Sequence, residues 1–453
     1  MNAGKTFAVI SQGCAANFGD GERIARALAA QHEGCKILFQ LPDNAADCRG
    51  QNAPDCGKQD TPNCGFHDSP DAIYLNVCTV KGNAGALKLL RYACEAFPDV
   101  PLFITGCAPK DFREEAMKVA PQVKFTSLAD IVIPRPQAEE SRPTRQNTIL
   151  RESPYVGIVN IEEGCLDACA FCSTHLVKGR LKSCAPEGIV EQVRNLVQDG
   201  CTEIQLTGQD CACYGFDTGT NLAALTQRIL AQVPGKYKLR LGMGNPRHMC
   251  SYADALLECF QDERMYKFIH IPVQSGSDAI LKAMNRRHTA SNFLRLAEQF
   301  NTRFPLFTLS TDLIVGFPGE TNDDFQATLR LLREARPTVC NITRFVSRPG
   351  TPAAKLEADP ALRIPDGVKH ERSAILAEAF QQVALENNRK WVGSTCEVVT
   401  EKAGHRAGTT IARNEAYRPV AISGDIPAGK RLTVRITGAE PFALLCDRSF
   451  VAV

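Results

Sequence analysis

Three cysteines in the middle of the chain are spaced like ligands of one metal centre. Cys165, Cys169 and Cys172 form the pattern C-x3-C-x2-C directly after an apolar run, 156–161, that predicts a strand. A loop this short brings three thiolates to one point. A 4Fe–4S cluster normally takes four cysteines, so three leave one iron open to another ligand. The spacing alone also fits a zinc site whose fourth ligand comes from elsewhere, or buried thiols without a metal.

The elements that must position this loop alternate short apolar runs with helical patterns. Within residues 155–385 the apolar runs are 156–161, 203–207, 238–242, 268–273, 308–315 and 339–345. Strands that alternate with helices indicate parallel βα units. Six such units predict a partial (β/α)6 barrel, because a closed TIM barrel needs about eight. Functional residues of these folds lie on the loops after the strands, where the cysteine loop falls.

Further regions flank this α/β barrel. Residues 1–133 predict a small N-terminal α/β domain, and residues 134–154, rich in Pro, Arg and Glu, predict a linker. The strand candidates of the first region are 6–10, 72–76, 102–105 and 123–125. Residues 392–453 contain short strands between glycine turns, which indicates a small antiparallel β-barrel. This last region has 8 Lys or Arg against 6 Asp or Glu, which weakly favours contact with RNA.

The amino-acid composition indicates the cellular compartment in which we expect the protein. The chain has 20 cysteines among 453 residues, without a secretory leader or an apolar stretch long enough to span a membrane. A secreted disulfide scaffold is therefore excluded, and we expect a cytoplasmic protein with reduced cysteines and no membrane partner. The net charge of +2 excludes a grossly basic nucleic-acid binder and leaves room only for local basic patches.

Motifs near the ends of later strands narrow the interpretation further. They are HIPVQSGSD (270–278), TDLIVGFPGET (311–321) and RPGTPAA (348–354). Together with the cysteine loop they resemble the methylthiotransferases of the radical S-adenosylmethionine (SAM) superfamily. The resemblance implies that the three cysteines hold a 4Fe–4S cluster, and that SAM binds at its open iron and is cleaved there to a 5′-deoxyadenosyl radical. The candidate contacts with SAM are Gln209, Gln274, Ser275 and Asp312.

The resemblance extends to the N-terminal domain. In the family, three cysteines at strand ends hold a second 4Fe–4S cluster, and the matching positions here are Cys14, Cys78 and Cys107. Spacing alone does not select this trio, because other cysteines of the same domain compete with it. They are Cys35, Cys48, Cys56, Cys64 and Cys94.

The C-terminal region resembles a TRAM domain, a small RNA-binding β-barrel. The resemblance implies contacts with RNA phosphates. The candidate residues are Lys402, Arg406, Arg413, Arg418, Lys430 and Arg431. Each of them is equally well explained as an ordinary solvated charge.

Local sequence favours one substrate branch of the family. LRLGMGNP (239–246), KGRLKS (178–183) and CTVK (78–81) are similar to the archaeal and eukaryotic branch, which acts on N6-threonylcarbamoyladenosine next to the tRNA anticodon. The branch implies that one SAM methylates a sulfur on the second cluster. A radical from another SAM then removes hydrogen from C2 of the adenosine, where the methylthio group joins.

The same resemblance implies the partners of the protein, but it leaves alternatives for the substrate and for the class of function. The partners are tRNA as substrate, a reductase or ferredoxin as electron donor, and a sulfur donor. The alternative substrates are a different tRNA adenosine and an aspartate of a ribosomal protein. An alternative of another class is a non-catalytic iron–sulfur protein that binds RNA.

Two cysteine features depart from the family pattern. Residues 36–70 resemble an insertion, in which an eight-residue repeat begins at Cys48, Cys56 and Cys64. Either these thiols bind a further metal, with His67, or the repeat is a surface loop of turns, which we favour. Near the expected SAM site, Cys211 and Cys213 either pack in the core, as free cysteines commonly do, or take part in sulfur delivery.

Overall fold

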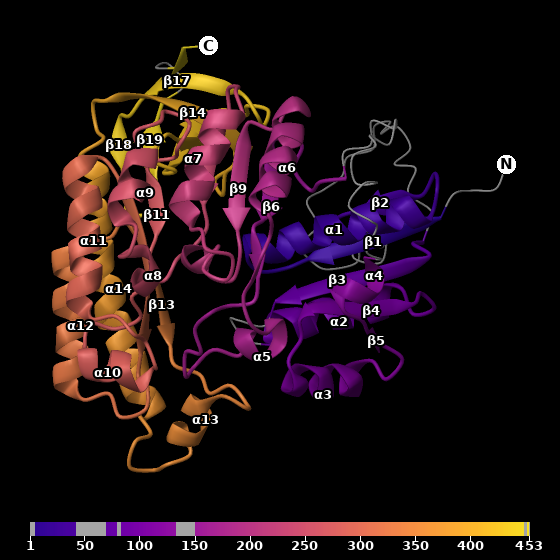
Figure 1. Ribbon diagram of the computed structural model, residues 1–453, viewed down its shortest axis with the longest axis horizontal. Coiled ribbons are helices and arrows are strands. Elements are labelled where there is room, and N and C mark those ends of the chain that lie inside the picture. Colours follow the sequence, from indigo (N-terminus) through magenta and orange to yellow (C-terminus); the bar gives the residue numbers. More distant parts are fainter. Residues whose placement is uncertain (1–4, 42–68, 79–82, 133–149, 448–450, 453) are drawn as a thin grey trace. The chain divides into compact units, whose positions relative to one another are not determined.

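The computed structural model describes residues 5–41, 69–78, 83–132, 150–447 and 451–452. The chain divides into two compact units, Met1–Pro154 and Tyr155–Val453 (Figure 1). The repeat that begins at Cys48 lies outside the described residues, as does most of the expected linker, so both interpretations stay predictions. Among the described residues, no helix combines the length and the apolar character needed to cross a membrane.

The first unit is a parallel sheet with helices on both faces. Its strands, in sheet order, are β2 (Lys36–Leu38), β1 (Thr6–Ser11), β3 (Ala72–Cys78), β4 (Leu102–Cys107) and β5 (Lys124–Phe125). Its helices are α1 (Ala15–Gln31), α2 (Ala84–Ala96), α3 (Lys110–Val119) and α4 (Leu128–Ile131). Strand β2 was missed by the sequence analysis, because it falls in residues assigned to the insertion.

Alternation along β1 explains how both faces of this sheet are buried. Phe7 and Val9 join the apolar cluster that contains Ile24 of α1, while Ala8 and Ile10 join the cluster that contains Leu90 of α2. Successive side chains of a strand point to opposite faces, so one strand contributes to both clusters. The predicted α/β character of this region is confirmed.

The barrel of the second unit has its six strands in chain order, as predicted. They are β6 (Val156–Asn160), β9 (Glu203–Thr207), β10 (Lys238–Leu241), β11 (Phe268–His270), β12 (Thr308–Val315) and β13 (Val339–Arg344). The first three and the last three form two parallel sheets. The amide of Leu239 donates to Arg264 O at 2.7 Å and joins β10 to the segment before β11.

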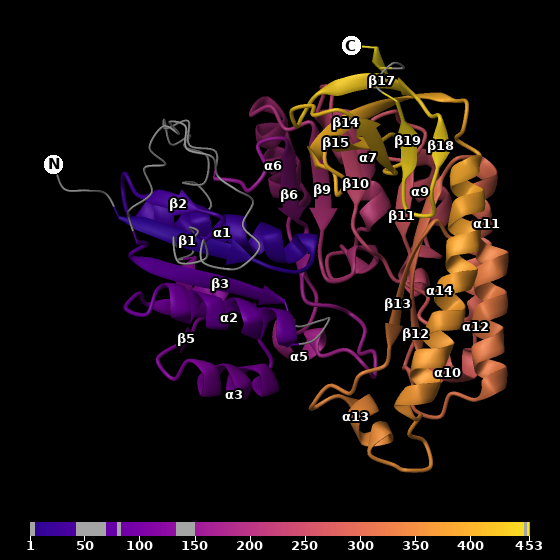
Figure 2. The ribbon, with the colours of Figure 1, turned by 180° about the vertical axis from the view of Figure 1, so that it is seen from behind.

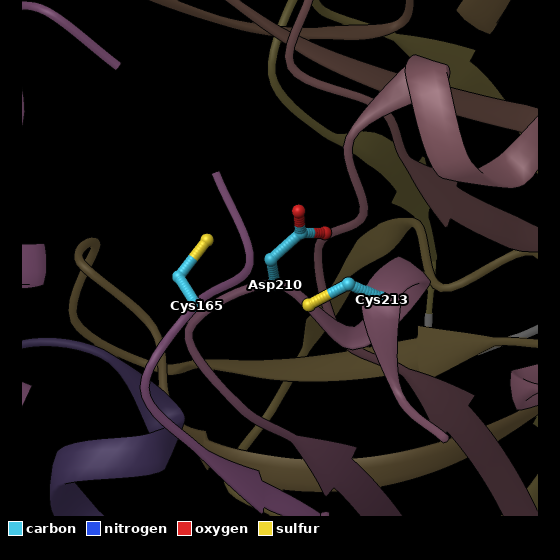
Figure 3. Close-up of side chains that lie close together, drawn as sticks. All are labelled: Cys165, Asp210 and Cys213. Carbon is cyan, nitrogen blue, oxygen red and sulfur yellow. The ribbon is translucent and has the colours of Figure 1, made fainter. Parts of the chain in front are cut away.

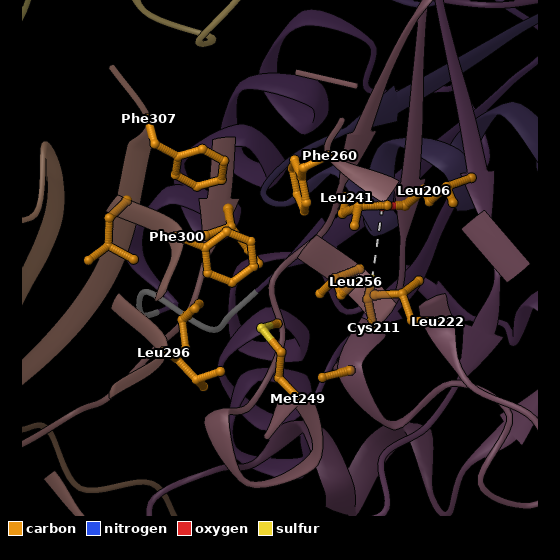
Figure 4. Packing of buried hydrophobic residues seen from close by; sticks show 14 of the residues in the cluster. Leu206, Cys211, Leu222, Leu241, Met249, Leu256, Phe260, Leu296, Phe300 and Phe307 are labelled. Atoms are coloured by element: carbon orange, nitrogen blue, oxygen red, sulfur yellow. Dashed lines mark hydrogen bonds between the residues drawn. The ribbon is translucent and has the colours of Figure 1, made fainter. Parts of the chain in front are cut away.

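Helices surround these strands, and a phenylalanine-rich core lies between the helices and the strands. The long helices are α6 (Pro186–Gln198), α7 (Leu222–Gln232), α9 (Ala253–Cys259), α11 (Ala290–Arg303), α12 (Asn322–Ala335) and α14 (Asp366–Arg389). Phe260, Phe300 and Phe307 contact one another with ring centroids 5.1 to 5.4 Å apart (Figure 4). Cys211 belongs to the same core and is fully buried, with its Sγ 3.9 Å from Leu206 O. This environment favours the packing interpretation for Cys211.

The C-terminal domain is a curled sheet around Trp391. Its strands, in sheet order, are β18 (Gly438–Ala439), β19 (Leu444–Cys446), β16 (Pro419–Ser423), β15 (Thr409–Asn414), β14 (Thr395–Ala403), β17 (Arg431–Arg435) and β20 (Val451–Ala452). Five of the six pairings are antiparallel, but β16 and β19 run parallel. The predicted small antiparallel β-sheet domain is confirmed, with one parallel pair, because the β18–β19 hairpin reverses the chain before β19 reaches β16.

The turn between β15 and β16 docks this domain onto the amino-terminal ends of the barrel strands (Figure 2). The Lys267 amide donates to Glu415 O at 2.8 Å, and Thr308 Oγ1 donates to Ala416 O at 2.6 Å. The ring of Tyr417 lies 5.1 Å from the Phe268 ring and 4.8 Å from the Arg240 guanidinium. The carboxyl ends of the strands, where the cysteine loop begins, are therefore the opposite end of the barrel.

We expect Tyr417→Ala to lower the free energy of unfolding by about 2 kcal/mol, because it removes a partly buried ring that packs against Phe268 and the Arg240 guanidinium. Urea unfolding measures this change. Phe442→Ala is the matched control, since Phe442 is an aromatic residue of the same domain that is 63% exposed, and its effect should stay within about 0.5 kcal/mol. Equal effects of the two substitutions would contradict the docking role of Tyr417.

Candidate functional site

The cysteine loop is fixed at its start by a small hairpin. β7 (Glu162–Glu163) pairs with β8 (Lys182–Ser183), and Cys165 bridges to Arg180. Gly164 has a φ of +82°, and a Cβ there would lie 2.1 Å from Arg180 O, so only glycine fits. The Gly164 amide donates to Gln209 Oε1 at 2.7 Å, which ties the loop to the end of β9. Gln209, predicted to contact SAM, thus holds the loop itself.

A buried carboxylate anchors the middle of the loop. Asp167 lies between the cysteines and accepts hydrogen bonds from Asn245 Nδ2 at 2.6 Å, from His248 Nε2 at 3.0 Å and from the Arg247 guanidinium. Asn245 is the N-cap of the short helix α8 (Pro246–Met249), and Arg247 and His248 lie within this helix, which follows β10. Burial alone would raise the pKa of Asp167, but the hydrogen bond from His248 and the charge of Arg247 outweigh it and hold the pKa below its ordinary value.

Hydrogen-bond donors also reach the cysteine sulfurs. The Asp167 amide lies 3.4 Å from Cys165 Sγ, and Arg286 Nη1 lies 3.5 Å from Cys169 Sγ. Donors aimed at sulfur stabilise thiolates and tune iron–sulfur clusters. Burial raises the pKa of Cys169 to about 11, so this thiol loses its proton readily only to a metal. The donor set therefore fits a thiolate-bound cluster at Cys165, Cys169 and Cys172.

Cys213 lies close to the first of these ligands (Figure 3). Cys165 Sγ, Cys213 Sγ and a carboxylate oxygen of Asp210 all lie within 4.8 Å of one another. A hydrogen bond with Cys213 holds the pKa of Cys165 below its ordinary value. Cys213 Sγ also lies 3.5 Å from Glu162 Oε2, and burial raises the pKa of Glu162 to about 9, so Glu162 carries a proton at neutral pH. Cys213, unlike Cys211, thus faces the site.

The other predicted SAM contacts have different surroundings. Asp312 accepts hydrogen bonds from His270 Nε2 at 3.0 Å and Asn341 Nδ2 at 2.7 Å. Gln274 has a φ of +77° and exchanges backbone hydrogen bonds with β12. Ser275 is fully buried with its hydroxyl 3.3 Å from Thr328 Oγ1, so it shapes the loop from within and is poorly placed to contact a ligand.

A cavity opens beside the cysteine loop. Its volume is about 240 Å³. The lining residues are Leu166, Asp167, Ala168, Arg247, Asn285 and Arg287. Sequence reasoning missed Asp167, His248 and Arg286, although the Asp between the cysteines and the basic residues after later strands were visible signals.

The three cysteines of the first unit also come together. Cys78 and Cys107 are register partners on the neighbouring strands β3 and β4. Cys14 precedes α1 and makes a side-chain hydrogen bond with Cys78, which raises the pKa of Cys14. A Cβ at Gly13, whose φ is +109°, would lie 2.2 Å from Cys78 Cβ. The backbone therefore brings the Cys14 and Cys78 side chains into contact by leaving no room between the two segments.

The predicted RNA contacts divide into three groups. Lys402, Arg406 and Lys430 are exposed on the C-terminal domain. Arg413 bonds Glu401 and Tyr417 O, and Arg431 bonds Glu397 and Lys236 O. Arg418 is 3% exposed, and its guanidinium is bonded to Asn388 and Thr338. All six stay predictions as RNA contacts.

Comparisons with known proteins agree with this arrangement. A model of the radical SAM superfamily matches residues 159–332, and a TRAM domain model matches residues 389–446. Among solved structures, the radical SAM methyltransferase TsrM from Kitasatospora setae aligns with a TM-score of 0.51 at 13% identity, over 78% of this chain and 77% of that chain. This likeness concerns the fold alone. Fold and site together define a radical SAM protein with a C-terminal TRAM domain.

Sequence relatives define the family within that class. A threonylcarbamoyladenosine tRNA methylthiotransferase of Pyrococcus horikoshii is 42% identical over 377 residues, covering 80% of this chain and 86% of the relative. The human protein of the same name is 29% identical over 430 residues, covering 90% and 68%. The chain belongs to the threonylcarbamoyladenosine tRNA methylthiotransferase family. The match to the Archaeoglobus fulgidus member, at 40% identity, spans 66% of that relative.

We expect Asp167→Asn to speed iron loss from the cysteine-loop cluster about tenfold, because residues that orient metal ligands typically affect metal affinity by this much or more. Anaerobic transfer of iron to a chelator measures the rate. Asp254→Asn, at an exposed carboxylate of α9, is the control and should release iron like the wild type. Equal rates in all three proteins would show that Asp167 does not order the loop.

We expect Gly13→Ala to abolish most iron binding by the first unit, because the new methyl group displaces Cys78. The experiment uses a background in which Cys165, Cys169 and Cys172 are serine, so that the iron counted is that bound by the first unit, which we expect to be about four atoms per chain. Gly34→Ala has a similar positive φ but no neighbour within 4 Å, and it controls for backbone strain. Equal iron content in the two variants would contradict the expected clash.

Proposed function

We propose that this protein transfers a methylthio group to C2 of N6-threonylcarbamoyladenosine next to the anticodon of tRNA. The observation that carries this proposal is the anchored three-cysteine loop in a chain that is 42% identical, over 377 residues, to a relative of that name. Radical chemistry suits the reaction, because an aromatic C–H is not acidic enough for removal by an ordinary base. Unpaired loop bases are also easily turned into a pocket.

Cys165, Cys169 and Cys172 would hold a 4Fe–4S cluster, which supplies the electron that cleaves SAM. The chain's own residues keep the loop in one shape. Asp167 anchors its middle through Asn245, His248 and Arg247, and Gln209 fixes its start. Arg286 donates to Cys169 and balances thiolate charge. These contacts hold the loop that carries the three cysteines in place.

Cys14, Cys78 and Cys107 would hold a second cluster in the same way, as carrier of the transferred sulfur. The support for this step is the register of Cys78 with Cys107 and the contact of Cys14 with Cys78. A sulfur donor must then reload this site, and a reductase or ferredoxin must supply electrons. We place the reaction in the cytoplasm, where tRNA and reduced thiols are available.

The exposed basic residues of the C-terminal domain would contact the tRNA backbone. Lys402 and Lys430 are exposed, and Arg406 has a side chain that is 77% exposed beside Glu440. Contacts of this kind position RNA without reading its sequence. Arg413 and Arg431 contribute less, because each is paired with a glutamate and, unlike Arg406, is only partly exposed.

Nucleoside analysis of tRNA tests the proposed activity. In a host that lacks this gene and any redundant enzyme, we expect the methylthiolated threonylcarbamoyl nucleoside to be absent by mass spectrometry. The wild-type gene should restore it, Cys165→Ser should not, and the control Cys250→Ser should. Persistence of the nucleoside in the deletion strain would overturn the assignment and favour another adenosine or a ribosomal protein as substrate.

Anaerobic reconstitution tests the alternative of another class. Formation of 5′-deoxyadenosine from SAM, with about eight irons per chain, supports an enzyme with two clusters. Clusters that form without SAM cleavage under reducing conditions would favour a non-catalytic RNA-binding protein.

A further inference from the structure

Arg418 is a buried cation that has no role in the proposed reaction. The residue is 3% exposed, and its Nη1 and Nη2 donate to Asn388 Oδ1 at 2.6 Å and to Thr338 Oγ1 at 2.8 Å. Both acceptors are neutral, and no carboxylate forms an ion pair with Arg418 among the residues that the structure describes. Its Nε is buried and has no hydrogen-bond partner in the described part of the chain. Buried charges are ordinarily paired, because an isolated one is costly.

Two further cations line the same cavity as Arg418. The cavity has a volume of about 180 Å³, and Arg336 and Lys390 share its lining with Thr338 and Asn387. Arg336 pairs with Glu386, while Lys390 Nζ donates to the neutral Asn387 Oδ1 at 3.1 Å. Lys390 is exposed and Arg336 is partly exposed, so these two cations lie at the mouth of the cavity while Arg418 is buried. Partial burial of Lys390 and the charges of Arg336 and Arg418 lower the pKa of Lys390. Three cations thus face one carboxylate, which leaves a surplus of positive charge.

The backbone holds this arrangement in place. Arg336 ends α12 in a left-handed conformation, with a φ of +49°, and its carbonyl accepts from Asn387 Nδ2 at 2.8 Å. Lys390 directly follows α14, and Arg418 lies in the turn that docks the C-terminal domain. Three separate elements therefore bring their cations to one point. The point lies at the amino-terminal ends of β12 and β13, away from the cysteine loop.

We propose that this cavity is a binding site for a phosphate group. A phosphate dianion supplies the missing negative charge, and its several oxygens accept hydrogen bonds from guanidinium and ammonium donors at once. The cavity is several times larger than the roughly 30 Å³ that one water occupies in the liquid, so it has room for such an ion. The phosphate comes either from an RNA backbone or from inorganic phosphate.

A matched pair of double variants tests this proposal in the full-length, cluster-loaded protein. Arg336→Gln with Lys390→Gln removes two cations from the cavity. Arg333→Gln with Arg389→Gln removes two cations that do not line the cavity, from the last turns of the two helices that Arg336 and Lys390 follow, and changes the net charge equally. Arg418 is left unchanged, because its loss would also weaken domain docking.

The first arm uses inorganic phosphate as the probe. Thermal unfolding is compared in phosphate and in chloride at equal ionic strength, since a ligand at a hundred times its Kd shifts the folding equilibrium about a hundredfold. We expect phosphate to raise the midpoint of the wild type and of the Arg333/Arg389 variant, and to have little effect on the Arg336/Lys390 variant.

The second arm uses an anticodon stem-loop RNA. Loss of one phosphate contact should reduce the slope of log affinity against log salt by about one, in the Arg336/Lys390 variant only. A difference in this arm identifies RNA as the source, and a difference in the first arm alone identifies the free ion. Indistinguishable behaviour of the two double variants in both arms overturns the proposal. Neither the unfolding midpoint nor the RNA affinity depends on methylthio transfer. A failure of the phosphate proposal can therefore be told apart from a failure of the proposed function.

Discussion

The carboxyl end of the barrel depends on the buried carboxylate of Asp167. A loop with three cysteines has few backbone hydrogen bonds of its own, and thiolates repel one another, so its shape must be imposed from outside. Asp167 receives three donors from a single connection, through Asn245, His248 and Arg247. Because the carboxylate and its donors are largely buried, removing one partner would leave the others unsatisfied. This hydrogen-bond network fixes the cysteine loop to the barrel.

Both units place their cysteines by the same rule of parallel sheets. Carboxyl ends of neighbouring parallel strands lie at one edge, so residues that follow different strands come together there. In the first unit the register of β3 with β4 pairs Cys78 with Cys107, and Gly13 leaves no space between Cys14 and Cys78. In the second unit the loop after β6 and the connections after β9 and β10 meet around Asp167 and Cys213. The opposite end of the barrel is free to carry the TRAM domain.

Much of this arrangement could be predicted from local sequence. Periodicity located all six barrel strands, and cysteine spacing singled out the three-cysteine loop, because both are short-range signals. Asp167 was visible between the cysteines, but its pairing could not be predicted, since its partners lie about eighty residues away and nothing local links them to it. The burial of Arg418 could not be predicted either. Arginine is usually a surface residue, and Arg418 is buried because its turn docks onto the barrel. Cys211 and Cys213 are two residues apart, yet one packs in the core and the other faces Cys165.

We propose that Cys165, Cys169 and Cys172 hold a cluster with one iron open to SAM. Electron paramagnetic resonance tests this in a variant whose Cys14, Cys78 and Cys107 are serine, so that a single cluster remains. We expect added SAM to change the g-values of the cluster signal in the reduced protein, because the ligand binds the open iron. A signal that does not change at saturating SAM would show that no iron of this cluster is open to SAM.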